Sequence, residues 1–226
     1  MQLQPYTLNR FSLYLDKHFD EFKEAISECI TESRYFHKGD AILEQGQEMD
    51  LLAIVPRGRI SVNIIASNGR RFQLGKVDCD HQVLGEMEFF TKTPCQWNII
   101  ADDEGMDIDF LSAQKLEKLL IQRPEFTMFF ASALSFDYQD SMDIYTNRLL
   151  HSITHNIAND LLLRNKNSVV LDAFSTFSQE AERFGTSGRV YRRAIKVLID
   201  KKLIVKDEGY LKIIDIEALK DFLAEQ

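Results

Sequence analysis

The segment Phe177–Leu198 most strongly limits the folds available to this chain, because it places two short amphipathic helices on either side of a glycine. It reads FSQEAERFGTSGRVYRRAIKVL. Gly185 can adopt the positive φ that ends a helix, and Ser187 is a favourable N-cap for the next one. The spacing therefore predicts a helix-turn-helix. Its inner faces are expected to contain Ala181, Phe184, Val190, Ala194, Val197 and Leu198.

The second of these helices carries a basic stripe. Arg189, Arg192, Arg193 and Lys196 are spaced i, i+3, i+4 and i+7, so they lie on one helical face. Such a helix suits the major groove of DNA. Two packed helices with a cationic solvent face are also common, and the stripe alone leaves both interpretations open.

A predicted hairpin follows the basic helix. Leu203–Val205 and Tyr210–Ile214 are short apolar runs on either side of the turn sequence Lys206-Asp207-Glu208-Gly209. A winged-helix domain carries its wing at this position, which favours the DNA-binding interpretation.

Charge is distributed unevenly along the chain. The net charge is −8, yet the segment 178–214 holds nine Lys and Arg against five Asp and Glu. The basic charge therefore lies where the helix-turn-helix is predicted. At 226 residues the chain is long enough for two ordinary domains. It has no apolar run long enough to span a membrane and no signal-peptide pattern, so a cytoplasmic location is expected.

The N-terminal half changes from helical to strand periodicity. Residues 10–33 predict two short helices, and residues 34–112 predict many short strands separated by turns, as in an antiparallel barrel or sandwich. Asn68-Gly69 is the strongest hairpin signal, and Pro56-Arg57-Gly58 is expected to separate two strands.

Helical periodicity returns after Ser112. Ser112–Gln122 predicts a short helix, and Pro124 opens a long helix that reaches about His151. A buried stripe and a heptad stripe run along it, and the heptad stripe leaves dimerisation open. The first stripe is Phe126, Phe129, Phe130 and Ala133; the second is Thr127, Ala131, Leu134, Tyr138, Ser141, Tyr145 and Arg148.

The layout resembles the Crp/Fnr family of bacterial transcription regulators. The matching segments are Phe36–Asp40, Glu44–Gly46, Pro56–Val62 and Leu84–Glu86, together with the register from Pro124 to Leu162. The resemblance implies an α+β chain with an antiparallel, cyclic-nucleotide-binding-like β-roll in residues 1–123. It implies a long dimerisation helix in residues 124–150 and a winged helix-turn-helix in residues 151–226.

The resemblance also implies a homodimer that binds double-stranded DNA, with RNA polymerase as a further partner. Ser187, Gly188, Arg189 and Arg193 fall where family members contact bases and phosphates, and Arg192 and Lys196 could bind phosphates. The base-reading Arg–Glu pair of the family is replaced by Gly188-Arg189, so a different target sequence is expected.

The effector pocket departs from the family pattern. Gly85 and Glu86 match the start of the phosphate-binding cassette, but Gln96 and Trp97 replace the Arg and Ser that hold the cyclic phosphate. Losing the guanidinium removes the charge that an anionic phosphate needs. Ser141 matches the helix hydroxyl that meets adenine. We expect no response to cAMP, we expect Glu86 to serve the local turn, and we predict no cofactor.

Other sensing chemistries find little support. Cys29, Cys79 and Cys95 form no metal-binding or disulfide spacing, although Cys95 could be a redox switch if its pKa were lowered. His151 and His155, at i and i+4, are expected to be a solvated pair rather than a metal site. No catalytic constellation is present. The alternative function is a ligand-binding signalling module whose C-terminal domain contacts proteins.

Overall fold

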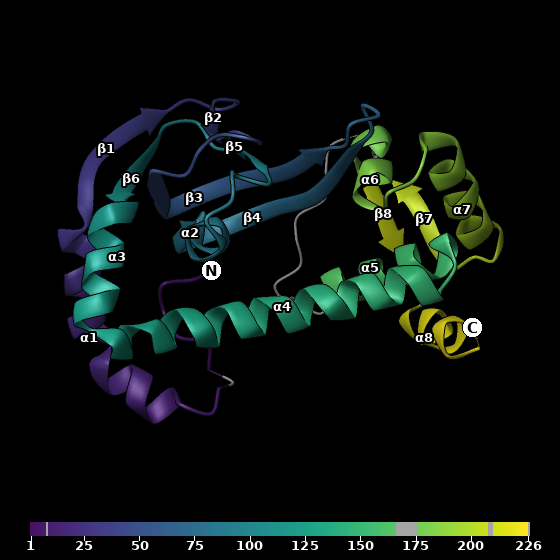
Figure 1. Cartoon of the computed structure of the whole chain (residues 1–226). Coiled ribbons are helices and arrows are strands. Elements are labelled where there is room, and N and C mark those ends of the chain that lie inside the picture. Colours follow the sequence, from purple (N-terminus) through teal and green to yellow (C-terminus); the bar gives the residue numbers. More distant parts are fainter. Residues whose placement is uncertain (8, 166–175, 208–209, 226) are drawn as a thin grey trace. The chain divides into compact units, whose positions relative to one another are not determined.

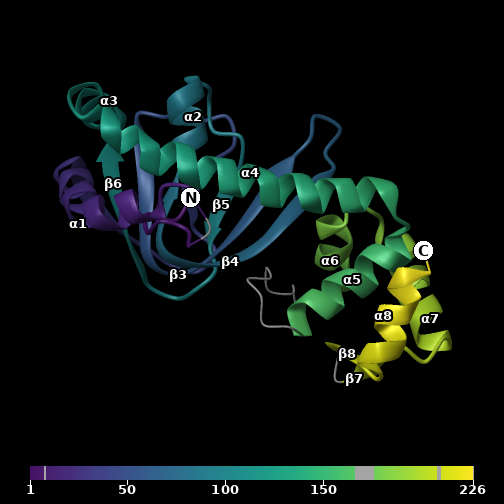
Figure 2. The same cartoon turned by 90° about the horizontal axis from the view of Figure 1, so that it is seen from below.

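The computed structural model describes residues 1–7, 9–165, 176–207 and 210–225, and the chain divides into two compact units. The roll unit comprises Met1–Ile64 and Lys76–Ser141. The helix-turn-helix unit comprises Ile65–Gly75 and Met142–Gln226. Figures 1 and 2 show the elements of both units.

The roll unit is built on an antiparallel sheet, as predicted (Figure 1). The strand order is β1-β6-β3-β5-β2, and β4 pairs with β3. The strands are β1 (Ile30–Phe36), β2 (Ala41–Leu43), β3 (Leu51–Ile65), β4 (Arg71–Leu84), β5 (Asn98–Ala101) and β6 (Met106–Ser112). The Asn68-Gly69 prediction is confirmed, because this dipeptide lies in the turn between β3 and β4 and Gly69 has φ +77°.

The predicted break at Pro56-Arg57-Gly58 is wrong, because β3 continues through these residues. Leu51–Ile54 pairs with β6, and Ile60–Asn63 pairs with β5. Pro56 therefore lies where the strand passes from one partner to the other, and its missing N–H removes no bond from either of these two ladders.

The prediction of two helices in residues 10–33 is also wrong. A single helix, α1 (Ser12–Glu28), is followed directly by β1. Phe22 of α1 is fully buried and stacks on Phe129, with the ring centroids 4.0 Å apart and an interplanar angle of 6°. This contact helps to fix α1 against the start of the long helix.

The further helical elements are α2 (Glu86–Thr91), α3 (Ala113–Gln122), the 3-10 turn η1 (Pro124–Phe126) and α4 (Thr127–Leu150). Helices α3 and α4 follow the prediction closely, whereas α2 was not predicted. Ser112 caps α3, since its side chain accepts a hydrogen bond from the backbone N–H of Lys115. The predicted buried stripe is confirmed, because Phe126, Phe129, Phe130 and Ala133 all belong to the core.

The helix-turn-helix unit places α5 against both α7 and α8 (Figure 2). Its elements are α5 (Ile153–Asn165), α6 (Phe177–Arg183), α7 (Gly188–Asp200), β7 (Ile204–Asp207), β8 (Tyr210–Ile213) and α8 (Ile216–Ala224). Strands β7 and β8 form the predicted antiparallel hairpin. The turn residues Glu208 and Gly209 lie outside the described residues.

No described helix combines the length and apolar character needed to cross a membrane.

Candidate DNA interface and effector site

The turn between α6 and α7 is built as the sequence predicts. Gly185 has φ +62°, in the left-handed region. Ser187 has an extended backbone, and its hydroxyl accepts a hydrogen bond from the Val190 N–H at 3.4 Å. Thr176 caps α6 in the same way through the Gln179 N–H. Capped ends of this kind define where α7 begins.

The buried face of α7 differs from the predicted one. The core side chains are Tyr191, Ala194, Ile195 and Leu198. Val190 and Val197, predicted to face inward, are 42% and 38% exposed. Apolar residues cover a wide arc of this helix. The side of the helix that contains Tyr191 is the one that packs against α5 and α6.

The four predicted cations lie together on the outer surface of α7. Arg189, Arg192, Arg193 and Lys196 are all exposed. Within the described part of the chain, none of them has an ion-pair partner. The guanidinium of Arg192 lies over Gly188, whose added Cβ would be 3.5 Å from Arg192 Nη1. This face of α7 therefore presents uncompensated positive charge to solvent.

The cations of the hairpin are engaged within their own unit. Lys212 Nζ lies 2.6 Å from Asp207 Oδ2, and Lys206 Nζ lies 4.5 Å from the centre of the Phe177 ring. These contacts leave α7 as the more strongly basic surface of the two.

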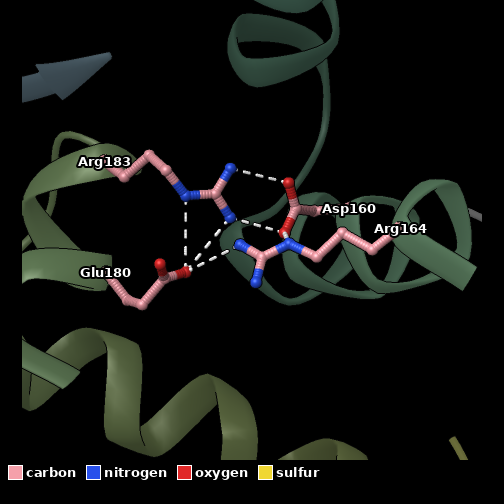
Figure 3. A network of polar contacts seen from close by, with 4 residues as sticks. All are labelled: Asp160, Arg164, Glu180 and Arg183. Carbon is pink, nitrogen blue, oxygen red and sulfur yellow. Dashed lines mark hydrogen bonds and ion pairs between the residues drawn. The ribbon is translucent and has the colours of Figure 1, made fainter. Parts of the chain in front are cut away.

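A buried ion network holds α6 against α5 (Figure 3). Arg183 is 3% exposed, and its Nη1 donates to Asp160 Oδ1 at 2.7 Å. Glu180 Oε2 accepts from Arg183 Nη2 at 3.1 Å and from Arg164 Nη2 at 3.0 Å. Burial alone would lower the pKa of Arg183, but Asp160 and Glu180 together raise it. The network thus combines two guanidinium groups and two carboxylates from facing helices.

Sequence reasoning missed this network. The available signal was the pair of spacings Asp160–Arg164, at i and i+4, and Glu180–Arg183, at i and i+3. Those spacings do not show that the two pairs meet.

Of the predicted effector residues, Gly85 and Glu86 lie at the start of α2. Gly85 has φ +90°, and an added Cβ would lie 2.3 Å from Met49 Cε, so the position requires glycine. Glu86 is buried at 7% exposure. The backbone N–H of Gln96 donates to Glu88 Oε1 at 3.1 Å. The side chain of Gln96 is exposed, whereas Trp97 and Ser141 are half-buried.

Parts of this chain resemble known proteins in sequence or in fold. Residues 33–123 match the family described as "Cyclic nucleotide-binding domain". The anaerobic regulatory protein of Bacillus subtilis (strain 168) is 24% identical over 158 residues, which cover 70% of this chain and 59% of that protein's length. The c-di-GMP responsive global regulator CLP of Xanthomonas campestris aligns with TM-score 0.72 and 15% identity over 87% of this chain and 99% of that chain.

A protein of Eubacterium rectale assigned to the Crp/Fnr transcriptional regulators aligns with TM-score 0.67 and 15% identity, covering 90% of this chain and 94% of that chain. Residues 33–123 thus match the cyclic nucleotide-binding domain, and the chain shares the fold of these two solved regulators.

The expected role of Glu86 needs correction. Its carboxylate does more than serve the local turn, because Oε1 accepts a hydrogen bond from the Met1 ammonium at 2.8 Å. Asp137 of α4 lies on the other side of the same ammonium, with 3.8 Å between Oδ2 and the nitrogen. The N-terminal segment was missed because no sequence pattern links Met1 to residues so far along the chain.

The expected redox role of Cys95 is not supported. All three cysteines are buried free thiols. Burial raises the pKa of Cys95; the hydrogen bond to the Trp97 carbonyl opposes this increase, and Glu88 adds a smaller one. A reactive cysteine needs a lowered pKa.

The expectation of a solvated histidine pair is wrong for His155. It is 7% exposed and stacks on His151, with the ring centroids 4.0 Å apart. Burial lowers the pKa of His155, and the neighbouring His151 lowers it further. Among the described residues no cluster of three or more His, Cys, Asp or Glu side chains is arranged to hold a metal ion.

Proposed function

We propose that this Crp/Fnr chain is a sequence-specific DNA-binding transcription regulator that acts as a homodimer. The single observation that carries the proposal is the exposed basic face of α7, whose start is fixed by the Ser187 cap. A capped helix with cations along its outer face can enter the major groove. The functional division we propose is a sensor domain in residues 1–123, a dimerisation helix in residues 124–150 and a DNA-binding domain in residues 151–226.

The four cations would divide between bases and phosphates. Arg189 and Arg193 belong to successive turns of α7 and are the proposed base readers, because a guanidinium can bind guanine O6 and N7 together. Arg192 and Lys196 are the proposed phosphate contacts. Ser187 would serve mainly through its capping bond, and Gly188 would let the backbone approach the DNA closely.

Dimerisation would use the exposed side of α4. The apolar residues exposed there are Tyr138, Met142, Tyr145 and Leu149. They follow one another at steps of four, three and four, which is heptad spacing. This stripe replaces part of the predicted one, since Arg148 is half-buried and its guanidinium lies 5.8 Å from the centre of the Phe184 ring.

We propose that cAMP is not the effector. Gln96 and Trp97 supply no cation where the resemblance places the phosphate, and Gln96 is turned to solvent. The buried carboxylates of Glu86 and Glu88 would instead oppose an anion.

The alternative is a signalling module whose C-terminal unit contacts proteins. The unpaired cations of α7 favour DNA over this alternative, because a dense basic face matches phosphates. RNA polymerase is proposed as an additional partner of the DNA-bound dimer.

Selection of random duplex DNA by the purified full chain, without added ligand, tests the proposal. The expected result is a two-fold symmetric motif bound with a steep salt dependence. Arg193→Ala should weaken binding to that motif, and Arg10→Ala, which removes an exposed arginine of the roll unit, should not. Recovery of no motif, or equal binding by the two variants, would favour the protein-contact alternative.

Salt dependence separates the two proposed roles. Lys196→Ala should weaken binding to all sequences and reduce the slope of log K against log salt by about one for each protomer. Lys23→Ala, an exposed lysine of α1, is the matched control. An unchanged slope for Lys196→Ala would remove this residue from the phosphate contacts.

A further inference from the structure

The N-terminal segment, residues 1–6, is the least expected feature of the roll unit. Met1 is 3% exposed and Leu3 is 4% exposed, and both side chains belong to the hydrophobic core of that unit. The segment precedes every helix and strand, so its burial requires specific partners elsewhere.

Backbone hydrogen bonds attach this segment to the end of β4. Val83 N–H donates to the Met1 carbonyl at 2.8 Å, and Leu3 N–H donates to the His81 carbonyl at 3.0 Å. Between them, Gln2 forms an antiparallel bridge with Gln82. The segment therefore extends the sheet directly before Gly85 and Glu86, which open the predicted effector site.

Two carboxylates from different elements meet the segment. The Met1 ammonium lies 2.8 Å from Glu86 Oε1 of α2 and 3.8 Å from Asp137 Oδ2 of α4. Tyr6 Oη donates to Asp137 Oδ1 at 2.6 Å, and the Tyr6 ring stacks on Phe136 with 4.2 Å between centroids. The segment thus bridges the glutamate of the effector site and the long helix.

We infer that residues 1–6 are the built-in occupant of the effector site, where they join β4 and Glu86 to α4 and leave no place for a cyclic nucleotide. The inference deepens the proposed function, because it rests on the assignment of Gly85–Glu86 as the effector position. Its evidence is the set of contacts within the roll unit and does not involve DNA.

The chemistry of the site fits a cationic or neutral occupant. Glu86 and Asp137 supply two carboxylates to the same ammonium, and burial of such groups is favourable only when they are paired and hydrogen-bonded. Burial raises the pKa of Asp137, and the ammonium opposes this increase. A nucleotide phosphate placed here would lose the ammonium and add a third negative charge.

Amide hydrogen exchange of the full chain, followed at single residues, tests the inference. Leu3→Asp puts a charge at a buried position and should release the segment, so the Val83 amide should exchange at least about tenfold faster. Leu13→Asp makes the same change at a leucine that is 87% exposed and should leave Val83 unchanged. Equal exchange at Val83 in all three proteins would overturn the inference.

A milder variant covers the case in which Leu3→Asp unfolds the roll. The reference amide is Ser112, which donates to the Cys29 carbonyl, outside the segment. Tyr6→Phe removes only the hydroxyl that binds Asp137, so exchange at Val83 and Leu3 should rise about tenfold while Ser112 stays slow. Tyr35→Phe, at an exposed tyrosine of β1, is its control. Equal exchange rates in Tyr6→Phe and Tyr35→Phe would contradict the proposed bridge.

The same measurement with cAMP distinguishes a permanent occupant from a displaceable one. At millimolar cAMP the Val83 and Leu3 amides should exchange as they do without it. Faster exchange would mean that the nucleotide displaces the segment, and slower exchange would mean that it binds beside it; both outcomes would overturn the inference. Because no DNA is present, failure here leaves the proposed role of α7 standing.

Discussion

The imidazole of His155 connects the stability of its unit to pH. Its folded-state pKa is lowered by burial and by His151, so the unfolded state binds more protons as the pH falls. The associated stability is therefore present above the unfolded pKa and is lost as the pH falls through about 6.5. We expect His155→Gln to reduce the loss of unfolding free energy between about pH 7 and pH 5.

Denaturant unfolding at a series of pH values checks this prediction. His37→Gln removes an imidazole whose side chain is 66% exposed and serves as the control. The slope of the unfolding free energy against pH should keep the wild-type value in His37→Gln and become shallower in His155→Gln. Identical slopes in both variants would show that His155 does not carry the effect.

The thiols should be unreactive in the folded chain. Burial raises the pKa of Cys79 to about 12, with a smaller increase from Asp78, and Cys79 and Cys95 are 6% and 3% exposed. Iodoacetamide at neutral pH should modify neither residue until the protein unfolds. Peptide mass spectrometry gives the rates, and Ser67→Cys, in an exposed turn, supplies a reactive reference. If Cys95 reacted as fast as this reference, the redox role would be open again.

At single positions the sequence predicts exposure of charge better than burial of apolar groups. Arg189, Arg192 and Arg193 were correctly placed on the surface because a charged group has a large cost of desolvation. Val190 and Tyr191 are adjacent, and either could face inward on amphipathic grounds. Only the partner rings of Phe177 and Phe184, both packed on Tyr191, decide between them.

At the scale of elements, the Arg183 network should determine how firmly α6 is held. Breaking a buried pair leaves its partner charges buried and uncompensated, so Arg183→Met should lower the unfolding free energy by about 3–5 kcal/mol. Lys220→Met breaks an exposed pair with Glu217, in which the atoms are 2.6 Å apart, and should cost about 0–1 kcal/mol. Chemical denaturation measures both.

An equal loss of unfolding free energy in Arg183→Met and Lys220→Met would mean that the buried network contributes no more than a surface pair. A larger loss in Arg183→Met would show that the buried network contributes more. The double variant Arg183→Met with Asp160→Leu should be more stable than Arg183→Met alone, because it leaves one carboxylate, Glu180, for the one remaining guanidinium, Arg164.

Elements with local signals were predicted well, and those set by distant partners were not. Capping at Ser112, Thr176 and Ser187 is local chemistry, although Thr176 was not singled out from the sequence. In contrast, Ile30–Phe36 becomes a strand because it pairs with β6 across most of the roll unit. The burial of Met1 against Glu86 likewise depends on a contact that spans 85 positions, and no periodicity could indicate it.

At the scale of the whole molecule, the proposed dimer needs a surface that pairs with its own copy. In a two-fold dimer each interface residue acts twice, so a small defect in one chain is doubled. The apolar stripe of α4, Tyr138, Met142, Tyr145 and Leu149, is the proposed surface. The heptad predicted from the sequence included Ser141 and Arg148 instead, because spacing alone does not show that Arg148 turns toward Phe184.

Leu149→Glu tests this surface directly. Leu149 is 85% exposed in the single chain, and burying a leucine contributes about 1.5–3 kcal/mol, so losing two copies should raise the dimer Kd by about 100-fold or more. Leu13→Glu changes a leucine of α1 that is 87% exposed and should leave the Kd unchanged. Sedimentation equilibrium measures both values.

Because the two half-sites are bound by one dimer, the affinity of Leu149→Glu for the selected motif should fall together with its dimerisation. A monomeric variant that kept full affinity would separate the two functions, and a variant that stayed dimeric would place the interface elsewhere.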